Sequence, residues 1–295
     1  WEPFDIYRKF IGKQKGEKLV ASETISKENR SLSHRISVWI RMNVFVPDAR
    51  VGWYPYAKKE IKKILEDHQI EAIVSIGPPH SSHLAGLHMA LRNNIPFYPV
   101  FIDPWVDIVY YRGMKRSALT VAADRYLEKK VLKKSKTAVF VTDSMRQDYI
   151  RKYDFLSRKS HIIYWGYNEE NFNGRKAEKK SSDKTVILHA GNIFDYQNPE
   201  HLWVYIKGKI DYGEKIELRF AGSVAPGIKA ALERAGLLEY VCFLGFLPYH
   251  QVVDEMLSAD YLLVCATEKR HVPGKLFEYM RCGNKIIAFG EDNAE

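Results

Sequence analysis

A helix start near the end of the chain brings together three groups that can bind a nucleotide. The stretch 267–280 follows a buried apolar run, and Pro273 suits the first position of the helix that begins there. Free N–H groups of Gly274 and Lys275 would face an anion, and the Lys275 amine adds a positive charge for a phosphate. Glu278, one turn later, can accept hydrogen bonds from two adjacent ribose hydroxyls. The alternative is an ordinary helix start with a surface lysine and glutamate.

Three glycine turns earlier in the chain extend this candidate site. Each follows a strand-like run, and glycine lets the backbone approach a ligand closely. Any one of them alone fits a simple tight turn, but together they predict a cradle at one end of a sheet. There, the backbone after the third turn could read the edge of a base. The predicted donor-binding residues are Gly191, Asn192, Gly222, Ser223, Phe246, Leu247, Gly274, Lys275, Leu276 and Glu278.

The front half offers two candidate catalytic residues. His80 lies at a predicted helix start, where the positive helix end would lower its pKa and leave a neutral base or donor. Asp103 follows the next strand and is either a catalytic carboxylate or a turn cap. His80 and His83 have a spacing that metal ligands use, but no carboxylate or cysteine is close in sequence, so no metal site is predicted.

Strand and helix patterns alternate along the chain and position these residues. The alternation predicts parallel sheets with helices on both faces, and ligands at the carboxyl ends of the strands. A polar stretch without periodicity predicts a linker at 167–183. We therefore expect an α/β protein with two Rossmann-like domains, 1–166 and 184–295, facing a cleft. Strands are predicted at 72–76, 97–102, 137–141, 161–164, 185–188, 216–220, 241–244, 261–265 and 285–289, and helices at 31–46, 55–68, 81–92, 117–134, 198–208, 226–235, 249–257 and 273–281.

Composition excludes several classes of protein. With 46% hydrophobic and 27% charged residues, the 295-residue chain is neither disordered nor fibrous, and no apolar run is long enough for a membrane span. No signal peptide opens it, and three scattered cysteines predict a reducing cytosol without disulfides or zinc. Through residue 166 there are 29 Lys and Arg against 17 Asp and Glu, and afterwards 16 against 19. The basic front half predicts an anionic partner, such as a membrane surface, or a solvated lysine-rich face.

A set of motifs resembles one enzyme family in order and spacing. The pieces are IVSIGPPHSSHLAG, FIDPW, ILHAGN, LRFAGS, VCFLGFLP, ADYLLV and VPGKLFEYMRCGNKIIAFG. They resemble the group 1, or family 4, retaining glycosyltransferases of GT-B architecture, above all the branch that makes bacterial surface polysaccharides. The resemblance implies that Glu278 binds the donor ribose. The family's first paired glutamate would fall at Arg270. The family's opening strand is not matched, so we expect the N-terminal domain to be incomplete, and the C-terminal end as well.

The resemblance also implies an activity. The protein would transfer a sugar from a UDP- or GDP-linked donor to a hydroxyl of a glycan or lipid-linked acceptor, without a metal or another cofactor. It would lie in the cytoplasm, peripherally on the inner face of the membrane, and would not bind nucleic acid. Two alternatives remain open: a non-enzymatic basic module that binds nucleotides or nucleic acid, and a sugar-nucleotide epimerase of the same fold.

Overall fold

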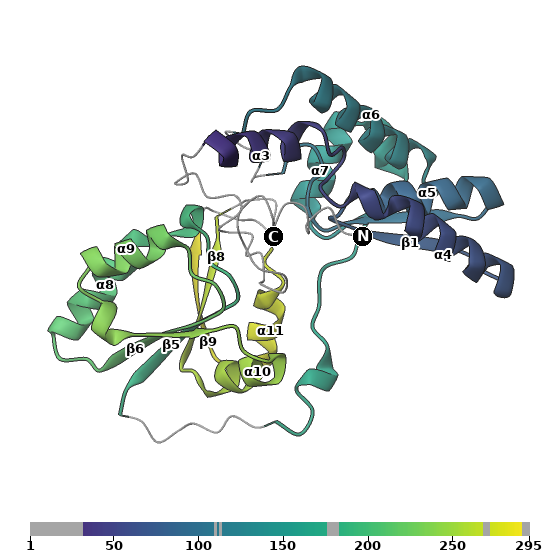
Figure 1. Ribbon diagram of the computed structural model, residues 1–295. Coiled ribbons are helices and arrows are strands. Elements are labelled where there is room, and N and C mark those ends of the chain that lie inside the picture. Colours follow the sequence, from purple (N-terminus) through teal and green to yellow (C-terminus); the bar gives the residue numbers. More distant parts are fainter. Residues whose placement is uncertain (1–31, 109–110, 112–113, 176–182, 268–271, 291–295) are drawn as a thin grey trace. The chain divides into compact units, whose positions relative to one another are not determined.

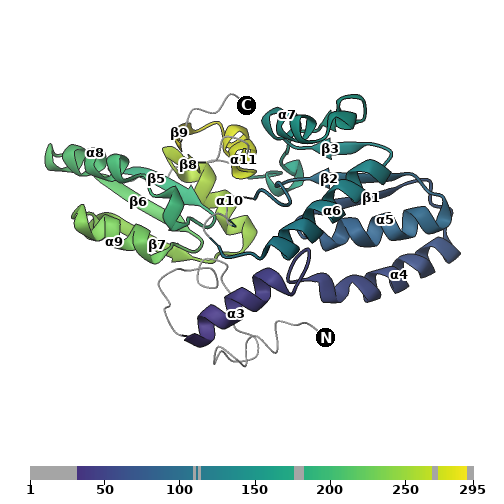
Figure 2. The ribbon, with the colours of Figure 1, turned by 90° about the horizontal axis from the view of Figure 1, so that it is seen from above.

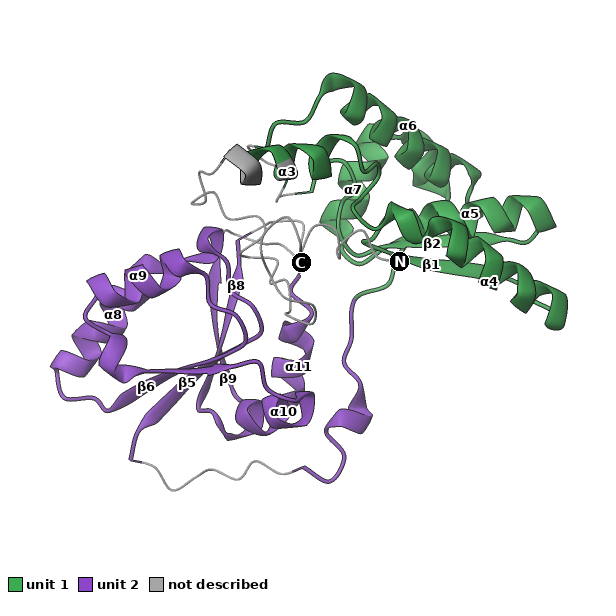
Figure 3. Ribbon diagram, in the orientation of Figure 1, with its two compact units in different colours: residues 1–19, 25–164 green, residues 20–24, 165–295 purple. Residues whose placement is uncertain are grey.

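The chain forms two compact units, which divide between Tyr164 and Trp165 (Figure 3). The computed structural model describes residues 32–108, 111, 114–175, 183–267 and 272–290. Each unit is a parallel sheet with helices, which confirms the predicted α/β class with two Rossmann-like domains. Phe172, inside the predicted linker, is 3% exposed and belongs to a core of unit 2, so part of that stretch packs on the unit. The predicted domain limits, 1–166 and 184–295, stay predictions.

Unit 1 contains one sheet of four parallel strands in the order β1-β2-β3-β4. Figure 2 shows α4 beside α5, with the strands behind them. The elements in chain order are α3 (Leu32–Asn43), a 3₁₀ turn (Val51–Trp53), α4 (Tyr54–Asp67), β1 (Ile73–Gly77), α5 (Ser81–Asn93), β2 (Phe97–Phe101), α6 (Ala118–Lys134), β3 (Ala138–Phe140), α7 (Asp143–Lys152), a 3₁₀ turn (Asp154–Arg158) and β4 (Ser160–Ile162).

The core of unit 1 lies between its sheet and helices α5, α6 and α7. Along β2, Phe97 and Phe101 alternate with less buried residues, so both rings point to the same face of the sheet. Phe101 stacks on Phe140 of β3, with ring centroids 5.4 Å apart. On β1, at the edge of the sheet, Val74 and Ile76 are 60% and 51% exposed.

Unit 2 is a doubly wound sheet with strand order β7-β6-β5-β8-β9. The chain runs from β5 outward to β6 and β7, then crosses back to β8 and β9 on the other side of β5. Helices α8 and α9 therefore cover one face, and α10 and α11 the other (Figure 1). The elements are a 3₁₀ turn (Glu169–Asn171), β5 (Thr185–Ala190), a 3₁₀ turn (Asp195–Gln197), α8 (Glu200–Asp211), β6 (Ile216–Ala221), α9 (Pro226–Arg234), a 3₁₀ turn (Leu238–Tyr240), β7 (Val241–Gly245), α10 (Tyr249–Ser258), β8 (Tyr261–Ala266), α11 (Lys275–Cys282) and β9 (Lys285–Gly290).

The position between β5 and β8 is the topological switch point of this sheet. Loops leave the two strands toward opposite faces there, and parallel sheets bind ligands at such a point. The loop after β5 contains Gly191, and the loop after β8 leads to Lys275. The topology therefore brings the two main parts of the predicted donor site to one place. Within the described residues, no helix combines the length and the apolar character that crossing a bilayer requires.

Candidate functional site

The loops that follow β5, β6 and β7 are hydrogen-bonded to one another. The Gly191 N–H donates to the Ala221 carbonyl at 2.6 Å, and the Gly222 N–H donates to the Gly245 carbonyl at 2.7 Å. The Asn192 side-chain oxygen accepts from the Ser223 N–H at 3.0 Å. Several N–H groups of the predicted cradle are thus engaged within this rim rather than directed at a ligand.

Gly222 is the position in this rim that requires glycine. Its φ is +134°, and a Cβ there would lie 2.5 Å from the Gly191 carbonyl oxygen. Gly191 has φ +104°, and a Cβ on it would meet the Lys275 amine at 3.0 Å. We expected Gly191 to let the backbone approach a ligand, and in the structure it makes room for the Lys275 amine.

The helix start at α11 has free backbone donors. The helix begins at Lys275 with Gly274 as N-cap, whereas the sequence predicted Pro273 as its first residue. The indole of Trp165 lies against Gly274, where a Cβ would come within 2.7 Å of the ring, and Trp165 itself is 41% exposed. Neither the Gly274 nor the Lys275 N–H donates to any described residue. Both groups are therefore free to bind an anion.

The Lys275 amine lies at the centre of the site, and its closest polar neighbour is a histidine. Its Nζ is 3.1 Å from Nε2 of His189, and no described Asp or Glu forms an ion pair with it. Burial lowers the pKa of Lys275 to about 8, partly offset by Cys265 and Glu278. A partly buried ammonium with no counter-ion among the described residues is costly and favours a bound anion.

Glu278 lies on the first turn of α11, next to the loop that follows β7. Its carboxylate accepts a hydrogen bond from the Tyr249 hydroxyl, which joins α11 to the start of α10. Phe246 is 55% exposed in that loop. Leu247 and Leu276 are partly buried against the core, so their side chains serve packing. The contacts of these residues with a donor remain predictions.

Tyr279 of α11 forms hydrogen bonds with both strands of the switch point, β5 and β8. It is fully buried, its hydroxyl accepts from the Ala190 N–H at 2.8 Å, and it donates to the Leu263 carbonyl at 3.3 Å. Burial raises its pKa well above the usual range, so the phenol stays neutral. Tyr279 was not among the predicted site residues, because its two hydrogen bonds join strands that are distant in sequence.

The histidines of unit 1 lie inside the fold. His80 is 4% exposed and stacks on Trp105, with ring centroids 4.8 Å apart and planes at 3°. His83 is fully buried, and its Nδ1 lies 2.7 Å from the Ser75 hydroxyl. Burial lowers the pKa of His80 to about 3, whereas we expected the helix end to be the cause. No group of three His, Cys, Asp or Glu side chains in the described part of the chain is arranged to hold a metal.

Asp48 stabilises the N-terminus of α5 from a distance. Its carboxylate accepts from the Ser81 N–H at 2.7 Å and from the Ser81 hydroxyl at 3.1 Å. The N-cap of α5 is His80, whose own side chain makes no capping hydrogen bond. The negative charge at the N-terminus of α5 thus comes from Asp48, 33 positions before Ser81. Local sequence patterns do not show a contact over that distance.

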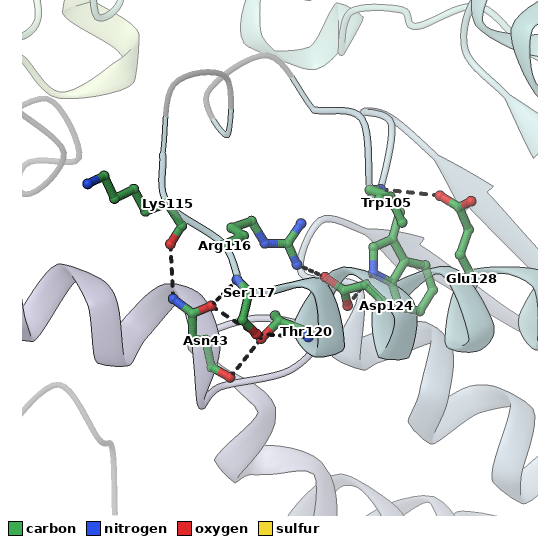
Figure 4. A network of polar contacts seen from close by, with 9 residues as sticks. Asn43, Trp105, Lys115, Arg116, Ser117, Thr120, Asp124 and Glu128 are labelled. Atoms are coloured by element: carbon green, nitrogen blue, oxygen red, sulfur yellow. Dashed lines mark hydrogen bonds and ion pairs between the residues drawn. The ribbon is translucent and has the colours of Figure 1, made fainter.

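Asp103 belongs to a loop that is held by two buried carboxylates of α6 (Figure 4). Asp124 accepts from the Trp105 indole at 3.2 Å and pairs with Arg116. Glu128 accepts from the Val106 N–H at 3.2 Å. It also accepts from two tyrosine hydroxyls and pairs with a lysine: Tyr149, Tyr153 and Lys152. The loop that carries Asp103 is therefore fixed at the carboxyl end of β2.

Two family models match the chain, one for each unit. Residues 20–171 match Glycosyltransferase Family 4, and residues 170–293 match the group 1 glycosyl transferases. The chain belongs to the family 4 glycosyltransferases. This confirms the resemblance that the motifs predicted. No curated protein sequence matches the chain significantly.

Solved structures of glycosyltransferases share the GT-B fold with this family member. Sucrose-phosphate synthase from Thermosynechococcus elongatus is 15% identical, with a TM-score of 0.56 over 81% of this chain. A variant of TarM from S. aureus, solved with Fondaparinux, alpha-GlcNAc-glycerol and UDP, is 12% identical, with a TM-score of 0.55 over 81%. The lipopolysaccharide outer core galactosyltransferase WaaB is 13% identical, with a TM-score of 0.51 over 80%. The chain spans 61%, 45% and 60% of these three proteins, respectively.

Proposed function

We propose that the protein is a retaining glycosyltransferase whose unit 2 binds a UDP- or GDP-linked sugar. The Lys275 ammonium carries this proposal: it lies at the switch point of the sheet, beside free N–H groups, and has no described counter-ion. Family membership supports the same ligand class. The diphosphate would bind Lys275 and the N–H groups of Gly274 and Lys275. The ribose would bind Glu278, and the base would lie against the backbone of Phe246 and Leu247.

Cleavage of the bond between the sugar and the diphosphate places negative charge on the leaving phosphate. Fixed donors aimed at that charge supply most of the stabilisation in such reactions. The α11 N-terminus and Lys275 would do this without a metal ion. His80 and Asp103, which follow the neighbouring strands β1 and β2, are the proposed acceptor-side residues. We infer that the acceptor is a glycan or lipid-linked hydroxyl in surface-polysaccharide synthesis.

Nucleotide binding tests the proposal directly. Isothermal titration of the protein with UDP and with GDP should show one site for the preferred nucleotide. Its thermal unfolding should shift upward, because a ligand at 100 times its Kd stabilises by about 2.7 kcal/mol. A folded protein that gives neither heat nor a shift with millimolar UDP or GDP would contradict the proposal. Product analysis with the matching sugar nucleotide then separates transfer from epimerisation.

We further propose that the basic face of unit 1 attracts the protein to anionic membranes. Five lysines at the end of α6 and just after it are exposed, and each is worth about 1 kcal/mol near an anionic surface: Lys129, Lys130, Lys133, Lys134 and Lys136. A second predicted cluster, 9–18, lies outside the described residues. This location would place the protein on the cytoplasmic side of the membrane, close to a lipid-linked acceptor.

Liposome co-sedimentation measures this attraction. We expect binding to vesicles that contain anionic lipid at low salt, and little binding at high salt or to neutral vesicles, because salt screens exposed charges. Replacing Lys129, Lys130, Lys133 and Lys134 by Gln should reduce the binding. The same substitution at four lysines of α4, namely Lys58, Lys59, Lys62 and Lys63, changes the net charge equally and so shows whether the α6 lysines act as a local patch. Equal binding to neutral vesicles would contradict the prediction.

A further inference from the structure

His189 is a polar residue near the carboxyl end of a mostly apolar strand, β5. It is 1% exposed on β5, between Leu188 and Ala190, which are buried as well. Both of its ring nitrogens have polar neighbours. Nδ1 lies 3.0 Å from the Leu263 carbonyl, and Nε2 lies 3.1 Å from the Lys275 amine. The chain thus maintains a buried imidazole where an apolar side chain would fill the strand.

The partners of His189 determine where its proton is. A neutral imidazole has one N–H, and a carbonyl oxygen can only accept. The Leu263 carbonyl lies 3.0 Å from Nδ1, whereas the Asn192 carbonyl lies 3.5 Å from Nε2, so the closer contact assigns the hydrogen to Nδ1, which donates to Leu263. Nε2 then has a free lone pair, which accepts a hydrogen from the Lys275 ammonium. Burial and the neighbouring Lys275 lower the pKa of His189 to about 3, so the imidazole stays neutral. The result is a directed chain of hydrogen bonds from Lys275 through His189 to Leu263.

The other groups around Lys275 do not hold its amine in this way. Cys265 faces it from β8, and Glu278 lies on its own helix; both affect its pKa, but neither forms a hydrogen bond with it. Gly191, after β5, contributes only space. Among the described residues, His189 is the one side chain that hydrogen-bonds the amine. Without it, a flexible four-carbon stem could turn toward solvent.

We propose that His189 is a positioning residue for the donor diphosphate: it holds the Lys275 ammonium at the switch point as a neutral acceptor. The inference rests on the proposed function of unit 2. An ammonium has three hydrogens, so one bond to His189 leaves two for phosphate oxygens. A carboxylate in place of His189 would also hold the amine, but it would cancel the charge that the diphosphate needs. A neutral imidazole fixes the amine and leaves its charge available.

Substitutions at His189 test this role through binding of UDP and of uridine. In His189→Leu, we expect UDP to bind about five- to tenfold more weakly, because the amine loses its position. Uridine affinity should stay unchanged, because uridine has no phosphate. His189→Gln should restore most of the UDP affinity, since its amide can donate to Leu263 and accept from Lys275. His201→Leu, at an exposed histidine of α8, is the matched control and should have no effect.

A second comparison separates positioning from general damage to the fold. In a Lys275→Ala background, His189→Leu should cause no further loss of UDP affinity, because no amine is left to position. Two results would overturn the inference but not the proposed nucleotide binding by unit 2. One is an equal loss of affinity for UDP and uridine in His189→Leu, and the other is a further loss of UDP affinity in the Lys275→Ala background. If the unmodified protein binds neither UDP nor GDP, the proposed function itself fails, and the inference with it.

Discussion

Replacing Lys275 by alanine should weaken UDP binding by a factor of roughly 10 to 150, which corresponds to about 1.5–3 kcal/mol for a charged hydrogen bond. The reason is that the Lys275 amine lies beside His189 and Gly191 at the switch point, where the diphosphate is proposed to bind. Uridine should bind Lys275→Ala as it binds the unmodified protein, because only the diphosphate loses a partner. Isothermal titration with both ligands measures the difference.

The fold should not weaken with this change. Burial lowers the pKa of Lys275, which means that the folded protein disfavours the charged amine. Removing it should leave thermal unfolding unchanged or raise the midpoint. Lys285→Ala is a suitable control, since Lys285 is exposed at the opposite end of the sheet, over the Tyr261 ring. If Lys275→Ala penalises uridine and UDP alike, its assignment to the diphosphate is wrong.

The pH dependence of the same measurement follows from the lowered pKa. UDP needs the charged amine, whose pKa in the free protein is about 8. The affinity for UDP should therefore be nearly constant from about pH 7 up to the pKa of Lys275 in the free protein. Above that pH, the affinity should decrease by at most about tenfold per pH unit. The terminal phosphate of UDP has a pKa of about 6, so its charge does not change between pH 7 and 9. Lys275→Ala should show a flat profile between pH 7 and about 8.5, below the range in which the uracil ring of UDP loses its proton.

Replacing Glu278 by glutamine should weaken UDP binding roughly tenfold, because a neutral amide is a poorer acceptor for ribose hydroxyls than a carboxylate. The effect should depend on the sugar. The unmodified protein should bind 2′-deoxy-UDP more weakly than UDP. Glu278→Gln should bind the two nucleotides with nearly equal affinity. In the free protein the Tyr249 hydroxyl already donates to this carboxylate, which holds it beside the loop after β7. Tyr249→Phe should have a smaller effect in the same direction.

The control for this prediction is Glu233→Gln, at an exposed glutamate of α9. It removes the same negative charge as Glu278→Gln, but away from the proposed site. It should bind both nucleotides as the unmodified protein does. If Glu278→Gln binds UDP normally, or if it weakens UDP and 2′-deoxy-UDP to the same extent, Glu278 does not bind the ribose. It would then be one more residue on the surface of a helix, tied to Tyr249.

The arrangement of strands and helices was predictable from the sequence because buried parallel strands are continuous apolar runs. The five strands of unit 2 match their predicted ranges within two residues at either end. Local patterns also indicated the helix start at α11, although the helix begins at Lys275 and not at Pro273. Trp165, which packs on Gly274, comes from more than a hundred positions earlier, so no local pattern shows it.

The contacts within the site were harder to predict because they join distant segments. The predicted strand 185–188 ends just before His189, and the bond of His189 to Lys275 depends on strand order, which places β5 beside β8. The side-chain oxygen of Asn192 links two loops, which no local pattern shows, and its contact with a donor stays a prediction. His80 and Asp103 were chosen for their positions after strands, and the burial of His80 against Trp105 depends on long-range packing.

The two buried carboxylates of α6 limit how unit 1 can move. Asp124 and Glu128 are both fully buried, and the loop from Asp103 to Ile108 supplies donors to each of them. Lifting that loop would leave two anions inside the protein with fewer donors, at an expected cost of several kcal/mol, roughly as for a broken buried ion pair. We therefore expect the loop from Asp103 to Ile108 to keep its conformation rather than to open as a hinged flap.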